Sequence, residues 1–156
     1  MLVRDAMNAD VEPCGPTDNL ATVAGIMWRN DCGVVPVLGD GRRVIGLITD
    51  RDICMAAATR DRLAREITVA DVCAWQVHAC APQDDVRSAL KTMEEHQVRR
   101  LPVIDRESGL VGMLSLHDIV RRATATRGRG GAGISHEDVM GALKALAEDP
   151  VGAATR

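Results

Sequence analysis

Two seven-residue segments of the chain, 46–52 (GLITDRD) and 112–118 (GMLSLHD), share one arrangement of polar residues. Each begins with glycine and continues to a hydroxyl residue and then an aspartate, namely Thr49 with Asp52 and Ser115 with Asp118. If the hydroxyl stands where a strand ends and a helix begins, it can hold an anion together with the free N–H groups of the first turn. The aspartate, one turn further on the same face, can accept hydrogen bonds from both hydroxyls of a ribose. The glycine would let such a ligand approach the backbone closely.

The same spacing is also that of a helix capping box. In that interpretation Thr49 and Ser115 are N-caps, and Asp52 and Asp118 are their acidic partners in the first helical turn. Capping alone does not require a glycine three residues upstream, so the duplicated glycine favours a ligand site. The motif leaves both interpretations open.

The two segments belong to a longer internal repeat. Sliding the chain by 66 residues aligns 3–58 with 69–124 without a gap, and 13 of the 56 positions are identical. Many other positions exchange one apolar residue for another, and the register holds through turns as well as through regular elements. The sequence therefore predicts two copies of one structural unit.

Each copy has the pattern of strand, helix, strand, strand and helix. In the first copy the strands are predicted at 11–14, 34–38 and 44–49. The first helix is predicted from the capping residues 16–18 through Trp28, and the second helix at 51–58. In the second copy the strands are predicted at 77–80, 101–104 and 110–115, the first helix from the apolar stripe Val86 to Met93, and the second helix at 117–123. One such unit buries too little apolar surface to be stable alone, so two α/β units that pack sheet to sheet are expected.

The motif is preceded by VVPV at 34–37 in the first copy and by RRLPV at 99–103 in the second. Together these segments resemble the CBS domain, and the tandem arrangement over 3–124 resembles a Bateman module. The resemblance implies two CBS repeats with pseudo-twofold symmetry. It also implies a regulatory ligand that contains adenosine, such as AMP, ADP, ATP or NAD, and no catalytic cofactor. In this family each motif serves one cleft between the repeats.

The resemblance assigns residues to both clefts. The first would use Thr49 and Asp52, with Val11, Glu12 and Pro13 beside the base and with Val35 and Pro36 as a wall. The second would use Ser115 and Asp118, with Val77, His78 and Ala79 beside the base and with Leu101 and Pro102 as a wall.

Basic residues next to the motifs are candidates for phosphate binding. Arg51 and His117 follow the motif hydroxyls, and Arg99 and Arg100 precede the second Leu-Pro-Val run. The planar guanidinium suits phosphate, although a solvated basic edge would look the same in the sequence. The counterpart of the arginine pair in the first copy is the uncharged pair at 33–34, so the two clefts are expected to differ in affinity or in preferred ligand.

The rest of the chain follows from these boundaries. We predict a first repeat at 1–60, a linker at 61–68, a second repeat at 69–124, a Gly/Arg-rich linker at 125–134, a helix at 135–149 and a frayed tail at 150–156. The last helix is predicted from the capping pair Ser135 and Asp138, followed by apolar residues on one side.

Composition excludes several classes of function. A net charge of -3, with 19 basic and 22 acidic residues spread along the chain, gives no broad field for nucleic acid or anionic lipid. Tyr and Phe are absent and there are two Trp, so aromatic stacking on a base is not expected. Five cysteines without a C-x-x-C pair, and no apolar run long enough for a membrane span, predict a cytoplasmic protein.

Other patterns carry less weight. The segment 128–133 fits G-x-G-x-x-G but lacks a surrounding βαβ unit, and as an arginine-glycine segment it lacks aromatic partners. Only two of Cys73, His78 and Cys80 would point the same way, so no metal site is expected. No grouping of residues suggests catalysis.

The resemblance further implies a homodimer in which four CBS units form a flat disc, and an effector protein that the sequence does not identify. Met27, Trp28 and Met93 lie on helix faces that could form the dimer contact. Two alternatives stay open. One is a ligand-free structural or interaction module, which could hold a partner through 134–149; the other is a weak enzyme.

Overall fold

The computed structural model describes residues 1–107, 109–124 and 133–147, which divide into two compact units. The first-repeat unit comprises Asp10–Val77 and Ile104–Val111. The second-repeat unit comprises Met1–Ala9, His78–Val103 and the chain from Gly112 onward. Residues 1–9 therefore pack with the second repeat, although they precede the first repeat in the sequence. The predicted tail at 150–156 and most of the predicted linker at 125–134 lie outside the described residues.

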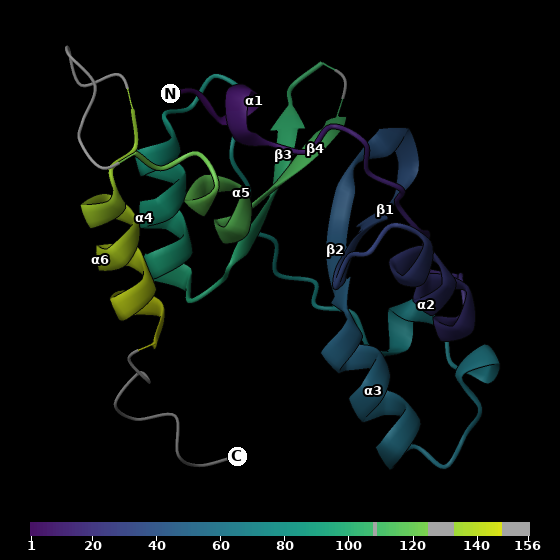
Figure 1. The fold of residues 1–156 in the computed structure, drawn as a ribbon. Helices are drawn as coiled ribbons and strands as arrows, with labels where there is room; N and C mark the ends of the chain where they lie inside the picture. Colours follow the sequence, from purple (N-terminus) through teal and green to yellow (C-terminus); the bar gives the residue numbers. More distant parts are fainter. Residues whose placement is uncertain (108, 125–132, 148–156) are drawn as a thin grey trace. The chain divides into compact units, whose positions relative to one another are not determined.

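The first-repeat unit is built on a two-stranded antiparallel sheet (Figure 1). Its elements are α2 (Leu20–Arg29), β1 (Val34–Leu38), a 3-10 turn (Asp40–Arg42), β2 (Val44–Thr49), α3 (Asp50–Thr59) and two further 3-10 turns, Ala64–Glu66 and Val69–Asp71. Both strands have the predicted bounds. The start of α2 was predicted wrongly: its N-cap is Asn19, whose side chain accepts a hydrogen bond from the Thr22 N–H, and not a residue of 16–18.

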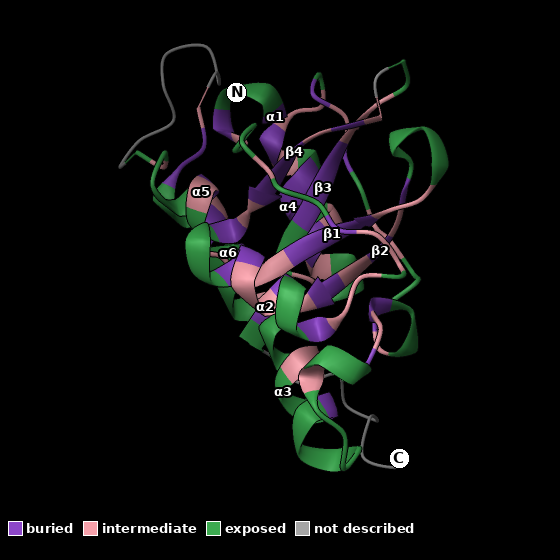
Figure 2. Cartoon of the chain, turned by 90° about the vertical axis from the view of Figure 1, so that its right-hand side faces the viewer, coloured by how far each residue is buried: buried purple, intermediate pink, exposed green. Residues whose placement is uncertain are grey.

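The core of this unit lies between α2 and the sheet. Val35, Val37 and Ile48 are fully buried in the strands, and α2 contributes a buried face that includes Met27 (Figure 2). The side chain of Trp28, the next residue along α2, is 89% exposed. The prediction that Met27 lies on an outer face was wrong, because the apolar stripe of α2 is wide enough to bury it.

The second-repeat unit repeats this plan and adds a helix. Its elements are α1 (Val3–Ala6), α4 (Val86–His96), β3 (Arg100–Asp105), β4 (Gly109–Ser115), α5 (Leu116–Val120) and α6 (His136–Ala147). Of the paired strands β3 and β4, the residues within Ile104–Val111 belong to the first-repeat unit. Met93 is fully buried in α4, so it does not face a partner as was expected.

The predicted strands at 11–14 and 77–80 are reduced to single bridge residues. Cys14 pairs in parallel with β1, and Cys80 pairs in parallel with β3. Each is the last residue of its segment, and each is buried. A prolyl residue just before Cys14, which lacks an N–H group, is one reason why the first ladder does not extend further.

The opposite edge of each sheet is closed by a segment that precedes the next predicted strand. Ala74 pairs antiparallel with Leu47 of β2, and Asn8 pairs antiparallel with Met113 of β4. Because the offset of 66 residues relates both pairs, the internal repeat holds in three dimensions as well as in the sequence.

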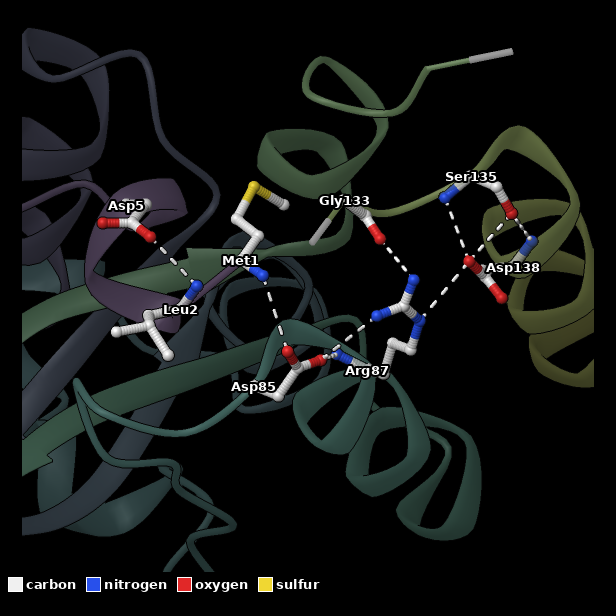
Figure 3. Close-up of polar contacts among 8 residues, drawn as sticks. All are labelled: Met1, Leu2, Asp5, Asp85, Arg87, Gly133, Ser135 and Asp138. Atoms are coloured by element: carbon white, nitrogen blue, oxygen red, sulfur yellow. Dashed lines mark hydrogen bonds and ion pairs between the residues drawn. The ribbon is translucent and has the colours of Figure 1, made fainter. Parts of the chain in front are cut away.

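The added helix α6 packs against α4 and α5 within the second-repeat unit. Arg87 of α4 donates a hydrogen bond to the Gly133 carbonyl, and its Nε lies 3.6 Å from the Asp138 carboxylate (Figure 3). Asp138 also accepts hydrogen bonds from the backbone and side chain of Ser135, at 3.0 and 2.8 Å. The predicted capping box is therefore present, and Arg87 ties it to α4.

Candidate functional site

The first motif spans the junction between β2 and α3. The Thr49 hydroxyl accepts a hydrogen bond from the Asp52 N–H at 3.2 Å. In return, Asp52 Oδ2 accepts hydrogen bonds from the Thr49 N–H at 2.8 Å and from the Thr49 hydroxyl at 2.7 Å. The pair forms a capping box at the start of α3.

The second motif has the same geometry between β4 and α5. The Ser115 hydroxyl accepts from the Asp118 N–H at 3.1 Å, and Asp118 Oδ2 accepts from the backbone and hydroxyl of Ser115. The capping interpretation is thus confirmed for both motifs. Among the described residues, no hydrogen bond reaches Oδ1 of either aspartate, so each keeps one oxygen for a further donor.

The motif glycines have a structural reason that differs from the expected one. A Cβ atom on Gly46 would lie 2.9 Å from the Ala74 carbonyl oxygen, and one on Gly112 would lie 2.7 Å from the Asn8 carbonyl oxygen. Real Cβ atoms essentially never come that close to another heavy atom. These glycines therefore admit the neighbouring backbone segment, and close approach of a ligand is not needed to explain them.

An open pocket of about 290 Å³ lies beside the first motif, entirely within the first-repeat unit. One wall is the face of α3 that carries Asp52, and the other is the segment that crosses from the last 3-10 turn to β2. The lining residues are Asp52, Met55, Ala56, Thr59, Arg60, Ala70, Asp71, Val72, Cys73 and Trp75. The spacing of the α3 residues by three or four places them on one face of the helix.

The charged side chains that line the pocket are two carboxylates, Asp52 and Asp71, and one guanidinium, Arg60. Arg60 donates a hydrogen bond to the Asp71 backbone carbonyl at 2.8 Å. The Thr68 hydroxyl and backbone N–H donate to the Asp71 carboxylate, and these hydrogen bonds hold the pKa of Asp71 below its usual value. The carboxylate of Asp71 therefore presents negative charge in the pocket, and the indole of Trp75 is half exposed beside it.

The remaining residues predicted for the first cleft are not among those that line this pocket. Val35 and Pro36 are buried in β1, and Arg51 is exposed on α3. Glu12 accepts hydrogen bonds from Arg29 at 2.8 Å and from Asn30 at 2.7 Å, both near the end of α2. Its neighbours Val11 and Pro13 are half-buried and exposed, respectively.

In the second repeat, Leu101 and Pro102 are buried in β3, whereas Arg99, Arg100 and His117 are exposed. The ring of His78 stacks on that of His96 with 3.6 Å between the ring centroids. Burial and the neighbouring His96 both lower the pKa of His78. Ala79 is exposed, and Val77 is half-buried at the end of the first-repeat unit.

Sequence reasoning missed most of the pocket wall. Met55, Thr59 and Arg60 could have been found from the i+3 and i+4 spacing that follows Asp52. The residues from Ala70 to Trp75 gave no such signal, because they reach α3 only through the pairing of Ala74 with β2. Trp75 also lines the pocket, although aromatic stacking on a base was not expected from the composition.

The described part of the chain lacks two further features. Within it, no three or more His, Cys, Asp or Glu side chains come together in an arrangement that could hold a metal ion. Within it, too, no helix is long and apolar enough to cross a membrane.

Comparison with known proteins agrees with the internal repeat. The CBS domain family matches residues 3–59 and 69–124. Hypoxic response protein 1 of Mycobacterium tuberculosis is 36% identical over 118 residues, which cover 76% of this chain and 82% of that protein. CBS domain-containing protein YhcV of Bacillus subtilis is 29% identical over 139 residues, which cover 88% and 97% of the two chains.

Solved structures show the same fold. The crystal structure of Hypoxic Response Protein I with two coordinated zinc ions aligns with a TM-score of 0.71 at 33% identity, covering 80% of this chain and 100% of that one. The CBS domain pair of protein MJ0100, in complex with 5′-methylthioadenosine and S-adenosylmethionine, aligns with a TM-score of 0.70 at 21% identity, covering 78% and 98%. With a family match over most of its length and two repeats in one register, this chain belongs to the CBS-domain family as a CBS-domain pair.

Proposed function

We propose that this chain is a regulatory module that binds adenosine-containing ligands at its two motifs and passes the ligand state to a partner protein. The observation that carries the proposal is the pocket in which Asp52 and Trp75 line one space. Its volume of about 290 Å³ is close to the lower end of small-molecule sites, which suits a nucleoside or mononucleotide.

Each part of a nucleoside has a candidate contact there. The free Oδ1 of Asp52 is an acceptor for a ribose hydroxyl, while Oδ2 remains engaged in the capping box. The indole of Trp75 offers a stacking surface for a base, an interaction worth roughly 1–3 kcal/mol in nucleic-acid complexes. The bound ligand would connect α3 to the segment 70–75, which leads into the second repeat.

The second motif is proposed to bind its ligand in the same way, through Asp118 and Ser115. Arg99, Arg100 and His117 are exposed in this unit and are proposed to contact phosphate groups of AMP, ADP, ATP or NAD. The complex of the MJ0100 CBS pair with two adenosine-containing molecules supports this ligand class. Arg51 would serve the first motif.

Calorimetry and thermal-shift scans with AMP, ADP, ATP, NAD, 5′-methylthioadenosine and S-adenosylmethionine test the proposal. We expect saturable binding, weakened about tenfold or more by Asp52→Ala or Asp118→Ala, since a hydrogen bond to a charged group contributes roughly 1.5–3 kcal/mol. The double variant should bind none of them. No binding at millimolar ligand would instead favour the ligand-free interaction module, and undiminished binding by the double variant would refute the ribose assignment.

We also propose a homodimer that forms through the exposed face of α2. Trp28 is the most exposed of the large apolar side chains in the described chain, and residues at helix interfaces are commonly of this type. Sedimentation velocity of the wild type and of Trp28→Glu should show a dimer and a monomer, respectively. A wild-type monomer at micromolar concentration would contradict the assignment.

The effector is proposed to be a separate protein in the cytoplasm. Five free cysteines, of which Cys14, Cys73 and Cys80 are buried, suit a reducing compartment. Capture experiments with and without ligand would show whether a partner responds to the ligand state.

A further inference from the structure

The offset of 66 residues pairs each lining residue of the first pocket with a counterpart in the second repeat. The two acidic positions are kept, because Asp52 and Asp71 correspond to Asp118 and Asp5. Three uncharged positions become basic, because Met55, Ala56 and Ala70 correspond to Arg121, Arg122 and Arg4. Arg60 corresponds to Thr126, and Trp75 corresponds to Ala9.

The structure supports this correspondence with equivalent contacts. In the first repeat, the Arg60 guanidinium donates to the backbone carbonyl of Asp71. In the second repeat, Arg122 Nε donates to the backbone carbonyl of Asp5 at 3.0 Å. Since Asp5 and Asp71 are equivalent residues, an arginine at or just beyond the end of the motif helix reaches the same carbonyl in both units, although Arg60 and Arg122 are not themselves equivalent by the offset.

The charges around the two motifs therefore have opposite sign. The first pocket is lined by two carboxylates and a single guanidinium, Arg60, which is already bonded to a carbonyl. The counterpart positions in the second repeat hold two carboxylates and three guanidiniums. Of these guanidiniums, that of Arg122 is also bonded to backbone carbonyls, and Arg4 and Arg121 supply the additional positive charge. Arg51, proposed above for the first motif, is exposed on α3 and is not among the lining residues. A phosphate inside the first pocket would therefore face like charges without a matching set of donors, which selects against it.

We infer that the first pocket, with Asp52, Asp71 and Trp75, selects an adenosine ligand without phosphate, whose substituent is uncharged or cationic, while the second motif takes the phosphorylated ligand. A cationic substituent such as a sulfonium would be attracted by the carboxylates and by the face of the indole. The inference rests on the proposed function, because it assumes that both motifs bind adenosine.

The test uses the full chain with Asp118→Ala, which weakens the second motif, and calorimetric titration with adenosine, 5′-methylthioadenosine, S-adenosylmethionine and AMP. Trp28→Phe is added so that Trp75 is the only tryptophan, and its fluorescence then reports on the first pocket. We expect the three ligands without phosphate to bind at least tenfold more tightly than AMP and to change the Trp75 emission.

A charge exchange makes the test sharper. Met55→Arg with Ala70→Arg installs the residues of the second repeat at two exposed positions, so folding should be unaffected. Added to the chain with Asp118→Ala and Trp28→Phe, this exchange should make AMP bind at least tenfold more tightly than it binds the same chain without the two arginines. Met140→Arg is the matched control, because it adds a charge at an exposed position of α6 outside the pocket and should leave the preference unchanged.

The outcomes separate the two proposals. If AMP binds the first pocket as tightly as adenosine, or if the arginine exchange leaves the preference unchanged, the inference is overturned and the proposed function stands. If Asp118→Ala abolishes all binding, the first pocket binds none of these ligands, so the inference is overturned and the proposed function holds for the second motif only. If no adenosine compound binds the wild type at millimolar concentration, the proposed function fails, and the inference fails with it.

Discussion

Substitution of Gly46 by alanine tests whether this position needs a glycine because the backbone of Ala74 packs closely against it or because a ligand does. The new Cβ would lie 2.9 Å from the Ala74 carbonyl oxygen and 3.3 Å from Cys73 Sγ, whereas ordinary contacts begin at 3.4 Å. This carbonyl accepts one of the two hydrogen bonds that join Ala74 to Leu47. To relieve the steric overlap, the segment at Ala74 would have to move away from β2.

The expected loss follows from this overlap. Overpacking of this kind costs about 1–3 kcal/mol in the free energy of unfolding. For a chain of this size, each kcal/mol lowers the melting temperature by about 2–4 °C. Gly112→Ala should cost at least as much, because its Cβ would lie 2.7 Å from the Asn8 carbonyl oxygen and 2.9 Å from Met7 Sδ.

Differential scanning calorimetry and urea unfolding measure the effect, and Gly141→Ala is the matched control. Gly141 lies inside α6 with nothing within 4 Å of its Cβ position, so alanine should stabilise the chain by about 0.5–1 kcal/mol. The reasoning is refuted if Gly46→Ala unfolds at the wild-type temperature. If that variant also loses ligand binding, the glycine serves the ligand after all.

Three further predictions follow from the contacts described above. Arg87→Met removes the contacts to Asp138 and Gly133, so it should lower the free energy of unfolding by about 1 kcal/mol. It should also speed hydrogen exchange in α6. Faster exchange confined to α3 would contradict the packing of α6 against α4 through Arg87. Burial raises the pKa of Cys14 and of Cys80 to about 12, above the value of about 9 for a free thiol. Their contribution to stability is therefore full below pH 9 and declines between pH 9 and 12, which urea unfolding at pH 8, 10 and 11 would show; a midpoint that is constant to pH 11 would count against it. Cys54 is exposed, so a maleimide should modify it much faster than Cys14 or Cys80 in the folded chain, as peptide mapping after a short pulse would reveal.

The extent to which the sequence predicted the fold varied with the range of the interactions involved. The bounds of β1 and β2 were predicted correctly because β-branched runs end in turn residues, and these signals are local. The strand at 11–14 was not predicted correctly. Its pairing with β1 is limited to the single bridge at Cys14, and Pro13 has no N–H group to extend it. The start of α2 was misplaced because Asn19 and Asp18 both qualify as caps by residue type.

The site shows the same division. Thr49 and Asp52 were placed together correctly, since their spacing along the chain fixes their geometry in a helix. Glu12 was expected beside a base, but Arg29 and Asn30 bind its carboxylate, and these residues meet it only in the folded unit. Trp75 was missed for a similar reason, because no local pattern indicates that residues 70–75 lie against α3.

The placement of residues 1–9 has a consequence for synthesis on the ribosome. The pairing of Asn8 with Met113 joins residues about 100 positions apart, and the hydrogen bond from Arg122 to Asp5 spans 117. This amino-terminal segment therefore waits unpaired while the first repeat is being made, and it can dock only after β4 has emerged. Cutting the chain between the repeats would leave one fragment with a surplus strand and the other with an open sheet edge, so the duplicated unit is not a module that can be separated at its sequence boundary.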